Sequence, residues 1–350
     1  MARKLQKLIF PVARTVVGLI LAVVLVYLTL KSTNTDLLAQ LKTANPALLA
    51  LAFALHGLVI LLGTWRWKIL LDVQNIRLRW RDLLRLTMIG FFFNLVIPGA
   101  VGGDLVKMGF ISRQTPGQRT ESVFSIMVDR IMGILGLFVV ASIVVVFSLP
   151  FLLALGEEYR TIQVAAFTVG LGSIAGALAV LALEFHHVFV YHPRMLRLFQ
   201  VLGNKLPAAV TDTIRRVMRA LDIFRKSPGA MVATLVLAVG IHSVLAFDLY
   251  MVGKSLHEDH LTVADYFLTA QVANAIAAIP VTPAGVGPRD YVAKTFFEAL
   301  EMNPDTIGAI PVTFTLIIIF WGLMGALVFI TAPIPKPRSD DRPQSDNEER

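Results

Sequence analysis

The sequence of 350 residues contains no cysteine and few charged residues. The absence of cysteine excludes disulfides, thiol nucleophiles and cysteine-ligated metals. Only 16% of the residues are charged and 56% are hydrophobic, whereas about a quarter of the residues in a soluble domain are charged. Together with a mean hydropathy of +0.69, this composition argues against a soluble enzyme and against a nucleic-acid partner, and it indicates a membrane protein.

Long apolar segments are abundant. Six of them reach the length of about 20 helical residues that a hydrocarbon core of about 30 Å requires; they are 12–30, 47–71, 122–149, 162–185, 230–252 and 307–330. The first follows basic residues as a signal peptide does, but no clear small-residue cleavage site follows it, so we interpret it as an uncleaved span. No segment alternates like a barrel strand. The expected fold class is therefore an all-α polytopic membrane protein with six spanning helices.

Two further apolar segments are interrupted by glycine and proline. Residues 83–97 precede one such break and a short helix to about Ile111, and residues 263–279 precede a second break and a helix over 291–300. Non-helical backbone at membrane depth is tolerated only where protein or a water-filled cavity surrounds it. Both segments are therefore predicted to be re-entrant helical hairpins.

The basic residues that give the chain its net charge of +8 are unevenly distributed along the sequence. They concentrate at the N-terminus, after the second span, after the first hairpin and in segment 187–229, all of which the positive-inside rule places in the cytoplasm. The stretch assigned to the cytoplasmic end of the second span carries Arg66, Lys68, Arg77, Arg79, Arg81 and Arg85. Acidic residues in the 150–161 loop and around the second hairpin suit the outside. We expect a multi-pass protein of the cytoplasmic (inner) membrane with both termini in the cytoplasm.

The two hairpins resemble each other. Pro98-x-x-Val101-Gly102-Gly103-Asp104 matches Pro283-x-x-Val286-Gly287-Pro288-Arg289-Asp290 with one inserted residue. Each hairpin lies between two spans, which gives a single domain, 1–331, made of units 12–149 and 162–331 in opposite orientation. Inverted repeats with broken helices in corresponding positions indicate a transporter whose site lies near the membrane midplane.

Two segments lie outside this repeat pattern. In 187–229, apolar residues recur at helical spacing between arginines, which predicts an amphipathic helix on the anionic cytoplasmic leaflet of the bilayer. Residues 332–350 have the composition of a disordered cytoplasmic tail.

Three charged residues are predicted to lie at membrane depth. Asp104 and Asp290 follow the two breaks, and each could cap the second half-helix or place a charge where substrate or protons pass. Arg130 lies roughly 12 Å inside the third span, where an arginine usually faces a cavity or a partner. A structural pair with Asp129 is the alternative, but adjacent helical residues do not face each other.

Four more polar residues accompany the hairpins. Arg289 stands at a half-helix start, where a guanidinium and free N–H groups form a phosphate site; its alternative is an exposed arginine at the outer mouth. Lys107 lies one turn after the first of the two aspartates and could pair with it. Asn94 and Gln271 could line the hairpins or only bond neighbouring backbone.

Histidines supply the remaining candidates. His242 and Asp248 fall in the fifth span and His56 in the second, so they could couple transport to protons or form ordinary hydrogen bonds between helices. The sequence His257-Glu258-Asp259-His260 is not the zincin pattern, and we interpret it as a solvated outer loop. We expect no metal and no cofactor.

The stretches 94–104, 128–130 and 279–290 together resemble the transmembrane, flippase-like domain of lysylphosphatidylglycerol synthases and its stand-alone relatives, over about residues 10–332. The resemblance implies a lipid flippase-like fold with two re-entrant hairpins. It also implies functional roles for Asp104, Arg130 and Asp290, where the family commonly has the longer glutamate. Only the tail follows the last span, so aminoacylation is not implied.

The preferred hypothesis is a transporter that moves a phospholipid or polyprenyl-linked anionic lipid between leaflets by alternating access. One alternative is an intramembrane enzyme that acts on a lipid head group, with Asp104 or Asp290 as general base. The other is a non-transporting subunit that docks a partner protein.

Overall fold

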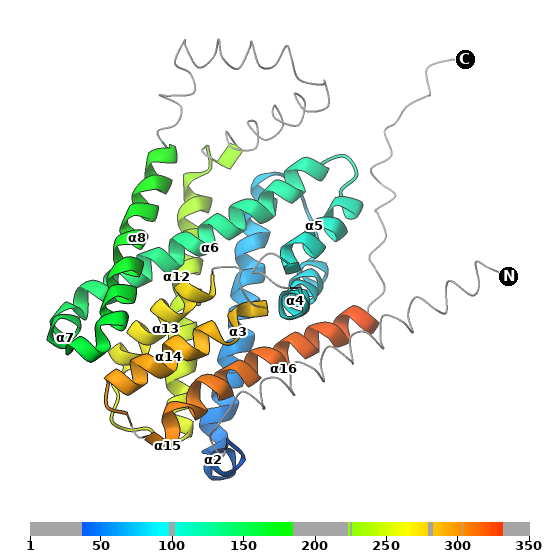
Figure 1. Ribbon diagram of the computed structural model, residues 1–350. Helices are drawn as coiled ribbons and strands as arrows, with labels where there is room; N and C mark the ends of the chain where they lie inside the picture. Colours follow the sequence, from blue (N-terminus) through cyan, green and yellow to red (C-terminus); the bar gives the residue numbers. More distant parts are fainter. Residues whose placement is uncertain are drawn as a thin grey trace, which may run out of the picture.

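In the computed structural model, residues 37–97, 102–184, 223–224, 226–278, 283–302 and 304–331 are described. Helices are the regular secondary structure of these residues (Figure 1). The predicted span 12–30, most of the predicted amphipathic segment 187–229 and the predicted tail 332–350 lie outside them.

Four helices of the described residues are long and apolar enough to cross a membrane. They are α3 (Pro46–Val73), α6 (Arg119–Phe147), α12 (Pro228–Ser255) and α16 (Ala309–Thr331). Each coincides with a predicted span. The predicted span 162–185 corresponds to α8 (Arg160–Glu184), a helix of 25 residues. The helical fold is therefore confirmed, whereas the total of six spans stays a prediction.

Local sequence explains where these helices begin. The Asn45 side chain accepts the backbone N–H of Ala47 at 3.0 Å, and Pro46 occupies a first-turn position that needs no N–H. The helix α13 (Val263–Ala277) begins with a capping box, in which Asp265 accepts the backbone N–H of Thr262 at 2.8 Å.

Two helix–break–helix units form where the sequence predicts them. The first is α4 (Trp80–Val96) followed by α5 (Gly102–Gln114), and the second is α13 followed by the 3₁₀ turn η2 (Pro283–Gly285) and α14 (Pro288–Ala299). In each unit the second helix packs back on the first. The helix α14 begins three residues earlier than the predicted Tyr291, because Pro288 is a favourable first-turn residue.

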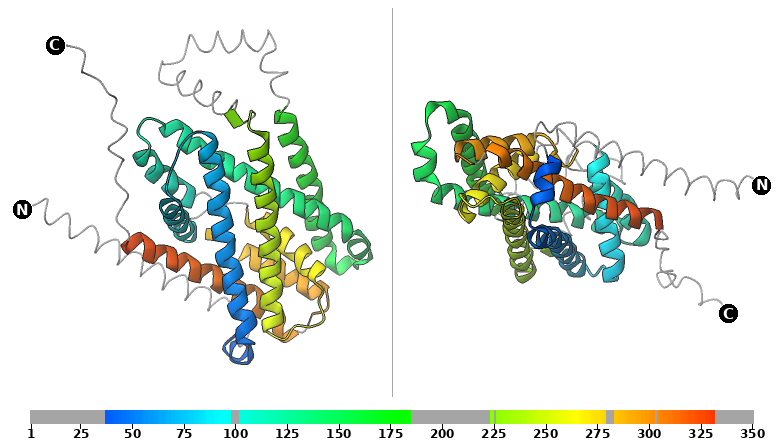
Figure 2. Two further views of the ribbon diagram at one scale, coloured as in Figure 1. Left: turned by 180° about the vertical axis from the view of Figure 1, so that it is seen from behind. Right: turned by 90° about the horizontal axis from the view of Figure 1, so that it is seen from below.

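The long helices α3 and α12 lie side by side and antiparallel at the centre (Figure 2). The helix α4 crosses them and is seen end-on in Figure 1. It packs against α16 and η2, while α6 packs against α5, α8, α12 and α13. The two helix–break–helix units thus contact each other through α4 and η2.

The two edges of the bundle differ in charge. The C-terminal ends of α3 and α8 and the N-terminal ends of α6 and α12 lie at one edge, at the top of Figure 1. The opposite edge carries the short helices α2 (Leu37–Thr43), α7 (Leu149–Ala154) and α15 (Pro304–Ile307). Connections and helix ends at the top edge carry Arg77, Arg79, Arg113 and Arg119, and those at the opposite edge carry Glu157, Glu158, Glu258 and Asp259.

The predicted loop 150–161 needs correction, because its first residues belong to α7 and Glu157–Tyr159 form a 3₁₀ turn. The proline at the start of α7 explains the difference, since it favours the first turn of a helix.

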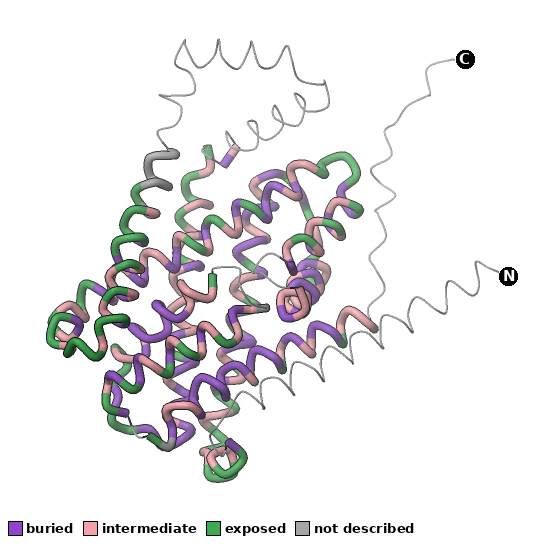
Figure 3. The backbone as a smooth tube through the Cα atoms, viewed as in Figure 1, coloured by how far each residue is buried: buried purple, intermediate pink, exposed green. Residues whose placement is uncertain are grey.

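Large apolar side chains cover much of the periphery. Leu171 and Leu178 on α8, Val236 on α12 and Phe147 at the end of α6 are all more than half exposed, and Figure 3 shows exposed residues along α7 and α8. Buried residues lie where α12, α13, α14 and α16 meet. An exposed apolar surface of this extent is typical of a protein whose solvent is lipid.

Candidate functional site

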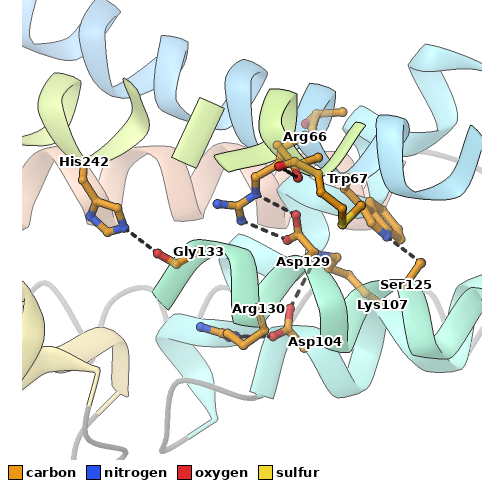
Figure 4. A network of polar contacts seen from close by, with 12 residues as sticks. Arg66, Trp67, Asp104, Lys107, Ser125, Asp129, Arg130, Gly133 and His242 are labelled. Carbon is orange, nitrogen blue, oxygen red and sulfur yellow. Dashed lines mark hydrogen bonds and ion pairs between the residues drawn. The ribbon is translucent and has the colours of Figure 1, made fainter. Parts of the chain in front are cut away.

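A cluster of ionisable side chains joins α3, α5 and α6 between otherwise apolar helices (Figure 4). We call it the polar network, and its charged members are Arg66, Asp104, Lys107, Asp129 and Arg130. Three are cationic and two are anionic, so the formal charge is 3 − 2 = +1. A net positive cluster among apolar helices attracts anions.

Asp104 and Arg130 form the outer pair of the network. The Asp104 carboxylate accepts from Arg130 Nε at 2.7 Å and lies 2.6 Å from Arg130 Nη2. Lys107 Nζ lies 3.5 Å from the other carboxylate oxygen, as predicted for two residues one helical turn apart. The Asp104 side chain is 13% exposed, whereas that of Arg130 is 40% exposed. The Arg130 side chain is therefore partly accessible while it pairs with Asp104.

The surroundings of Arg130 are apolar. Leu105 on α5, Met127 on α6 and Ile131 on α6 are all more than two-fifths exposed. Exposed hydrocarbon side chains thus lie close in sequence to both members of the Asp104–Arg130 pair. Such a face suits a molecule with an anionic group and apolar chains.

Asp129 turns away from Arg130 and pairs with Arg66 of α3. The contact has two hydrogen bonds, from Arg66 Nε at 2.8 Å and from Nη2 at 3.1 Å, which is the strong geometry of an arginine–carboxylate pair. The expectation that Asp129 and Arg130 would not pair with each other is confirmed. Residues adjacent in a helix point about 100° apart, so they reach different neighbouring helices.

The assignment of Arg66 to the cytoplasmic stretch after the second span is wrong. It lies within α3 and is buried. A Cβ atom at Gly133 would stand 3.2 Å from Arg66 Nη1, so this glycine leaves room for the guanidinium. The position of Arg66 within the predicted span 47–71 was the sequence signal for burial, because an arginine inside a span needs a partner.

Lys107 is held by an aromatic ring as well as by Asp104. Its Nζ lies 4.4 Å from the centre of the Trp67 ring, a cation–π contact. Trp67 is fully buried and donates from Nε1 to Ser125 Oγ at 3.1 Å. Sequence reasoning missed Trp67 and Ser125, since neither residue type signals a site by itself.

Asn94 caps the second half-helix of the first unit. Its Oδ1 accepts the backbone N–H of Gly103 at 2.8 Å. Asp104 also lies in the first turn of α5, but its side-chain hydrogen bonds go to Lys107 and Arg130. The amide from α4 thus accepts the Gly103 N–H, and Asp104 forms ion pairs. The residues just before α5 lie outside the described part of the chain, so the cap proposed for Asp104 stays a prediction.

Replacing Asn94 with alanine is expected to reduce the free energy of unfolding by about 1 kcal/mol. The first turn of α5 would lose its side-chain acceptor. Denaturant titration in mixed micelles would measure the loss, and Asn94→Asp, which retains an acceptor oxygen, is the control. Equal stability of the alanine variant and the parent would contradict the capping role.

In the second unit Asp290 does cap its helix. Its Oδ2 accepts the backbone N–H of Gly287 at 3.3 Å, and Gly287 has φ of 93°, a conformation that glycine adopts without strain. The other carboxylate oxygen accepts from Thr315 Oγ1 at 2.8 Å and from Arg289 Nη2 at 3.0 Å. The predicted cap is therefore confirmed for Asp290.

Arg289 is not an exposed arginine at the outer mouth, and that alternative is wrong. The residue is buried, its guanidinium lies 5.2 Å from the centre of the Phe314 ring, and it also contacts Thr315. Arg289, Asp290 and Phe314 line a small pocket together with Leu249, Ala270, Ala273, Asn274, Ala293 and Pro311. The space has room for about one water molecule.

The structure separates His242 from Asp248. His242 Nε2 donates to the backbone oxygen of Gly133 at 3.1 Å, and Gln271 donates to the backbone oxygen of His242 at 3.2 Å. Asp248 instead contacts His56 of α3, with 2.9 Å between Oδ2 and Nδ1. Figure 4 shows His242 at the margin of the polar network.

The loop 257–260, predicted to lie on the outer side, is only partly solvated. Glu258 is buried and accepts from the backbone N–H of His260 at 2.9 Å and from Thr306 Oγ1 at 3.1 Å. Lys254 donates to Asp259 at 2.8 Å, and this hydrogen bond and charge hold the pKa of Asp259 below its usual range. Within the described residues, no group of three histidine or acidic side chains could hold a metal ion.

Comparison of the sequence with known proteins shows a family match. The family model described as the lysylphosphatidylglycerol synthase TM region matches residues 15–325. A UPF0104 membrane protein of Pyrococcus horikoshii is 24% identical over 310 residues, covering 82% of this chain and 88% of the relative. A UPF0104 membrane protein of Methanothermobacter thermautotrophicus is 22% identical over 290 residues, covering 80% of this chain and 83% of the relative.

Proposed function

Because this chain belongs to the lysylphosphatidylglycerol synthase TM region family, we propose that it moves a lipid with an anionic head group between the two leaflets of a membrane. The substrate class is a phospholipid or a polyprenyl-linked lipid, because both join a phosphate to hydrocarbon chains. The observation that carries the proposal is the Arg130 side chain, which is 40% exposed although it pairs with the largely buried Asp104.

Arg130 lies at membrane depth. It is roughly 16 Å along α6 from Arg119, the first residue of that helix. A charge at this depth is costly unless it faces a partner or a cavity, and Arg130 pairs with Asp104 while its side chain stays 40% exposed. A lipid phosphate can approach it along the exposed side chains of Met127 and Ile131 while the acyl chains remain outside the bundle.

Phosphate and the Asp104 carboxylate would compete for the same guanidinium. When phosphate binds Arg130, the Asp104 carboxylate can move toward Lys107, which already lies 3.5 Å away. The network can therefore accept a second anion without leaving the Asp104 charge unpartnered. The Arg66–Asp129 pair keeps its contact while Asp104 changes its partner from Arg130 to Lys107.

The helix contacts support an inverted repeat. If α3, α4, α5 and α6 correspond to α12, α13, α14 and α16, each contact has a counterpart. The contacts of α4 with α16, α3 with α4 and α5 with α6 correspond to those of α13 with α6, α12 with α13 and α14 with α16. The central contact of α3 with α12 corresponds to itself, as a two-fold axis requires.

The polar contacts repeat as well. Asp104 pairs with Arg130, 26 residues further along the chain, and Asp290 bonds Thr315, 25 residues further along. Each unit thus joins the first turn of its second half-helix to its last long helix. This match supports a site in each unit, re-entrant hairpins and alternating access by movement of one unit against the other.

Charge at the two edges supports the proposed orientation. The top edge of Figure 1 carries the arginine-rich connections and the opposite edge the glutamate-rich ones. The positive-inside rule then places the top edge in the cytoplasm, which fits a six-span protein of the cytoplasmic membrane.

Leaflet exchange in proteoliposomes tests the proposal. Fluorescent anionic, polyprenyl-phosphate and zwitterionic lipids would be compared for protein-dependent exchange, and we expect exchange of the anionic lipids only. Replacing Arg130 with glutamine should reduce the exchange rate roughly 10- to 100-fold, since a hydrogen bond to a charged group contributes about 1.5–3 kcal/mol.

The matched control is Arg160→Gln. Arg160 pairs with Glu157 in an exposed contact at the other edge of the bundle, so its loss should leave exchange unchanged. Exchange no faster than in empty vesicles would refute transport. A chemically altered lipid, detected by mass spectrometry, would favour the intramembrane enzyme instead.

A further inference from the structure

A buried acid–base pair lies at the centre of the molecule and has no part in the polar network. His56 on α3 and Asp248 on α12 are 1% and 0% exposed, and their Nδ1 and Oδ2 atoms are 2.9 Å apart. The two helices form the central contact between the two proposed units. The pair therefore lies where those units would move against each other.

Each member of the pair has a second polar atom to satisfy. His56 Nε2 and Asp248 Oδ1 are buried, and neither has a hydrogen-bond partner among the residues that the structure describes. A buried ionic pair stabilises a fold only when its remaining polar atoms are also bonded, and apolar residues of similar volume often serve as well. Packing alone does not explain why an acid and a base occupy this position.

The pair is enclosed by aromatic rings. The His56 ring contacts Phe91 of α4, with 5.8 Å between ring centres, and Phe314 of α16, with 5.9 Å. Phe314 also stands against the Arg289 guanidinium, and the residue after Asp248, Leu249, lines the pocket with Arg289 and Asp290. One aromatic side chain thus separates the acid–base pair from the ion pair of the second unit.

Several ionisable groups of the neighbouring helices are bonded elsewhere, whereas the buried Tyr266 hydroxyl on α13 has no hydrogen-bond partner among the described residues. On α6, Asp129 pairs with Arg66, and Arg130 pairs with Asp104. On α12, the His242 ring bonds the backbone oxygen of Gly133, and Lys254 donates to Asp259. On α13, Asp265 accepts the backbone N–H of Thr262. On α14, Arg289 pairs with Asp290 behind Phe314. The helix α16 contains no ionisable residue, and α4 contributes Phe91.

Proton number decides the charge of this pair. With one proton shared between imidazole and carboxylate, the pair carries a charge of −1 in an apolar environment. A second proton makes the pair neutral overall, as imidazolium with carboxylate or as imidazole with carboxylic acid. The low dielectric of the surroundings favours the neutral form, so a change in conformation that admits water would favour release of the second proton.

We propose that His56 and Asp248 form a proton-binding site whose loading and release couple lipid movement to a proton gradient. This inference rests on the proposed transport function. The neutral pair stabilises the closed contact of α3 with α12, and loss of the proton leaves a buried negative charge that destabilises it. A ligand shifts a conformational equilibrium only through its different affinity for the two states, and the proton is that ligand here.

Infrared difference spectra across a pH titration test the proton site directly on the purified full chain. We expect a pH-dependent carboxyl absorption in the parent protein that is lost in Asp248→Asn and shifted in pH in His56→Gln. The control Glu258→Gln removes a buried carboxylate of the outer loop, remote from the pair, and should keep that absorption. A spectrum that is unchanged by Asp248→Asn would overturn the proposal.

Proteoliposomes with an imposed gradient test the coupling. One pH unit can shift the distribution of lipid between the leaflets by up to about tenfold per proton in the parent protein, and that shift should disappear in Asp248→Asn. A parent lipid distribution that is the same with and without the gradient, with exchange still present, would overturn the coupling and leave transport intact. If the parent showed no exchange, the proposed function would fail, and the infrared result would still decide whether the pair binds a proton.

Discussion

Replacing Asp129 with alanine is expected to lower the free energy of unfolding by about 3–5 kcal/mol, because Arg66 would keep its charge in a buried position without a carboxylate. The Arg66–Asp129 contact has two hydrogen bonds, and both side chains are largely removed from solvent. Denaturant titration in mixed micelles would measure the change. Because Arg66 and Asp129 hold the polar network in place, leaflet exchange should fall as well.

Two comparison variants separate this effect from a general sensitivity of the helix. Asp72 pairs with Lys68 on the exposed face of α3, and Asp72→Ala should change stability by less than about 1 kcal/mol. The double variant Arg66→Met with Asp129→Leu should recover most of the stability lost in Asp129→Ala, since apolar residues can replace a buried ion pair. Exchange should not recover. Equal effects of Asp129→Ala and Asp72→Ala would contradict the buried pair.

Replacing Gly103 with alanine is expected to cost about 3 kcal/mol of stability, because overpacking against backbone cannot be relieved by a rotamer change. The new Cβ would stand 1.9 Å from the backbone oxygen of Gly90 on α4. The two half-helices would have to separate, which would break the cap from Asn94 and displace Asp104 from Arg130. Lipid exchange should therefore be lost together with stability.

Gly109 provides the control on the same helix. A Cβ atom there would meet nothing within 4 Å, so Gly109→Ala should leave stability unchanged or raise it by up to about 1 kcal/mol through helix propensity. Thermal and denaturant unfolding in mixed micelles would measure the stability of both variants. If Gly103→Ala proved as stable as Gly109→Ala, the close approach of α4 and α5 would be wrong.

Much of the fold was predictable from local signals. Uninterrupted apolar runs predicted α3, α6, α12 and α16 to within a few residues. The breaks were predictable because proline and glycine end helices for local steric reasons. The short helix α7 is not predictable in the same way, because a proline is typical of a loop but also fits the first turn of a helix, where it stands here.

The site was predictable only as a set of unusual residues. Asp104, Arg130 and Asp290 stand out because a charge at membrane depth is costly wherever it lies. Their partners were less accessible to sequence reasoning. Thr315 gave no signal, since a threonine in an apolar helix bonds its own backbone as often as a neighbour.

The sequence by itself determined the membrane environment, the helices, their breaks and which charges must find partners, because hydrophobicity, proline geometry and the cost of burying charge are local properties. Tertiary structure alone decided the pairing. Asp129 selects Arg66 and not its neighbour Arg130, and Asp248 selects His56 and not His242, because helix crossing determines which side chains meet. The absence of cysteine left these buried ion pairs and close glycine contacts, rather than disulfides, to join distant helices.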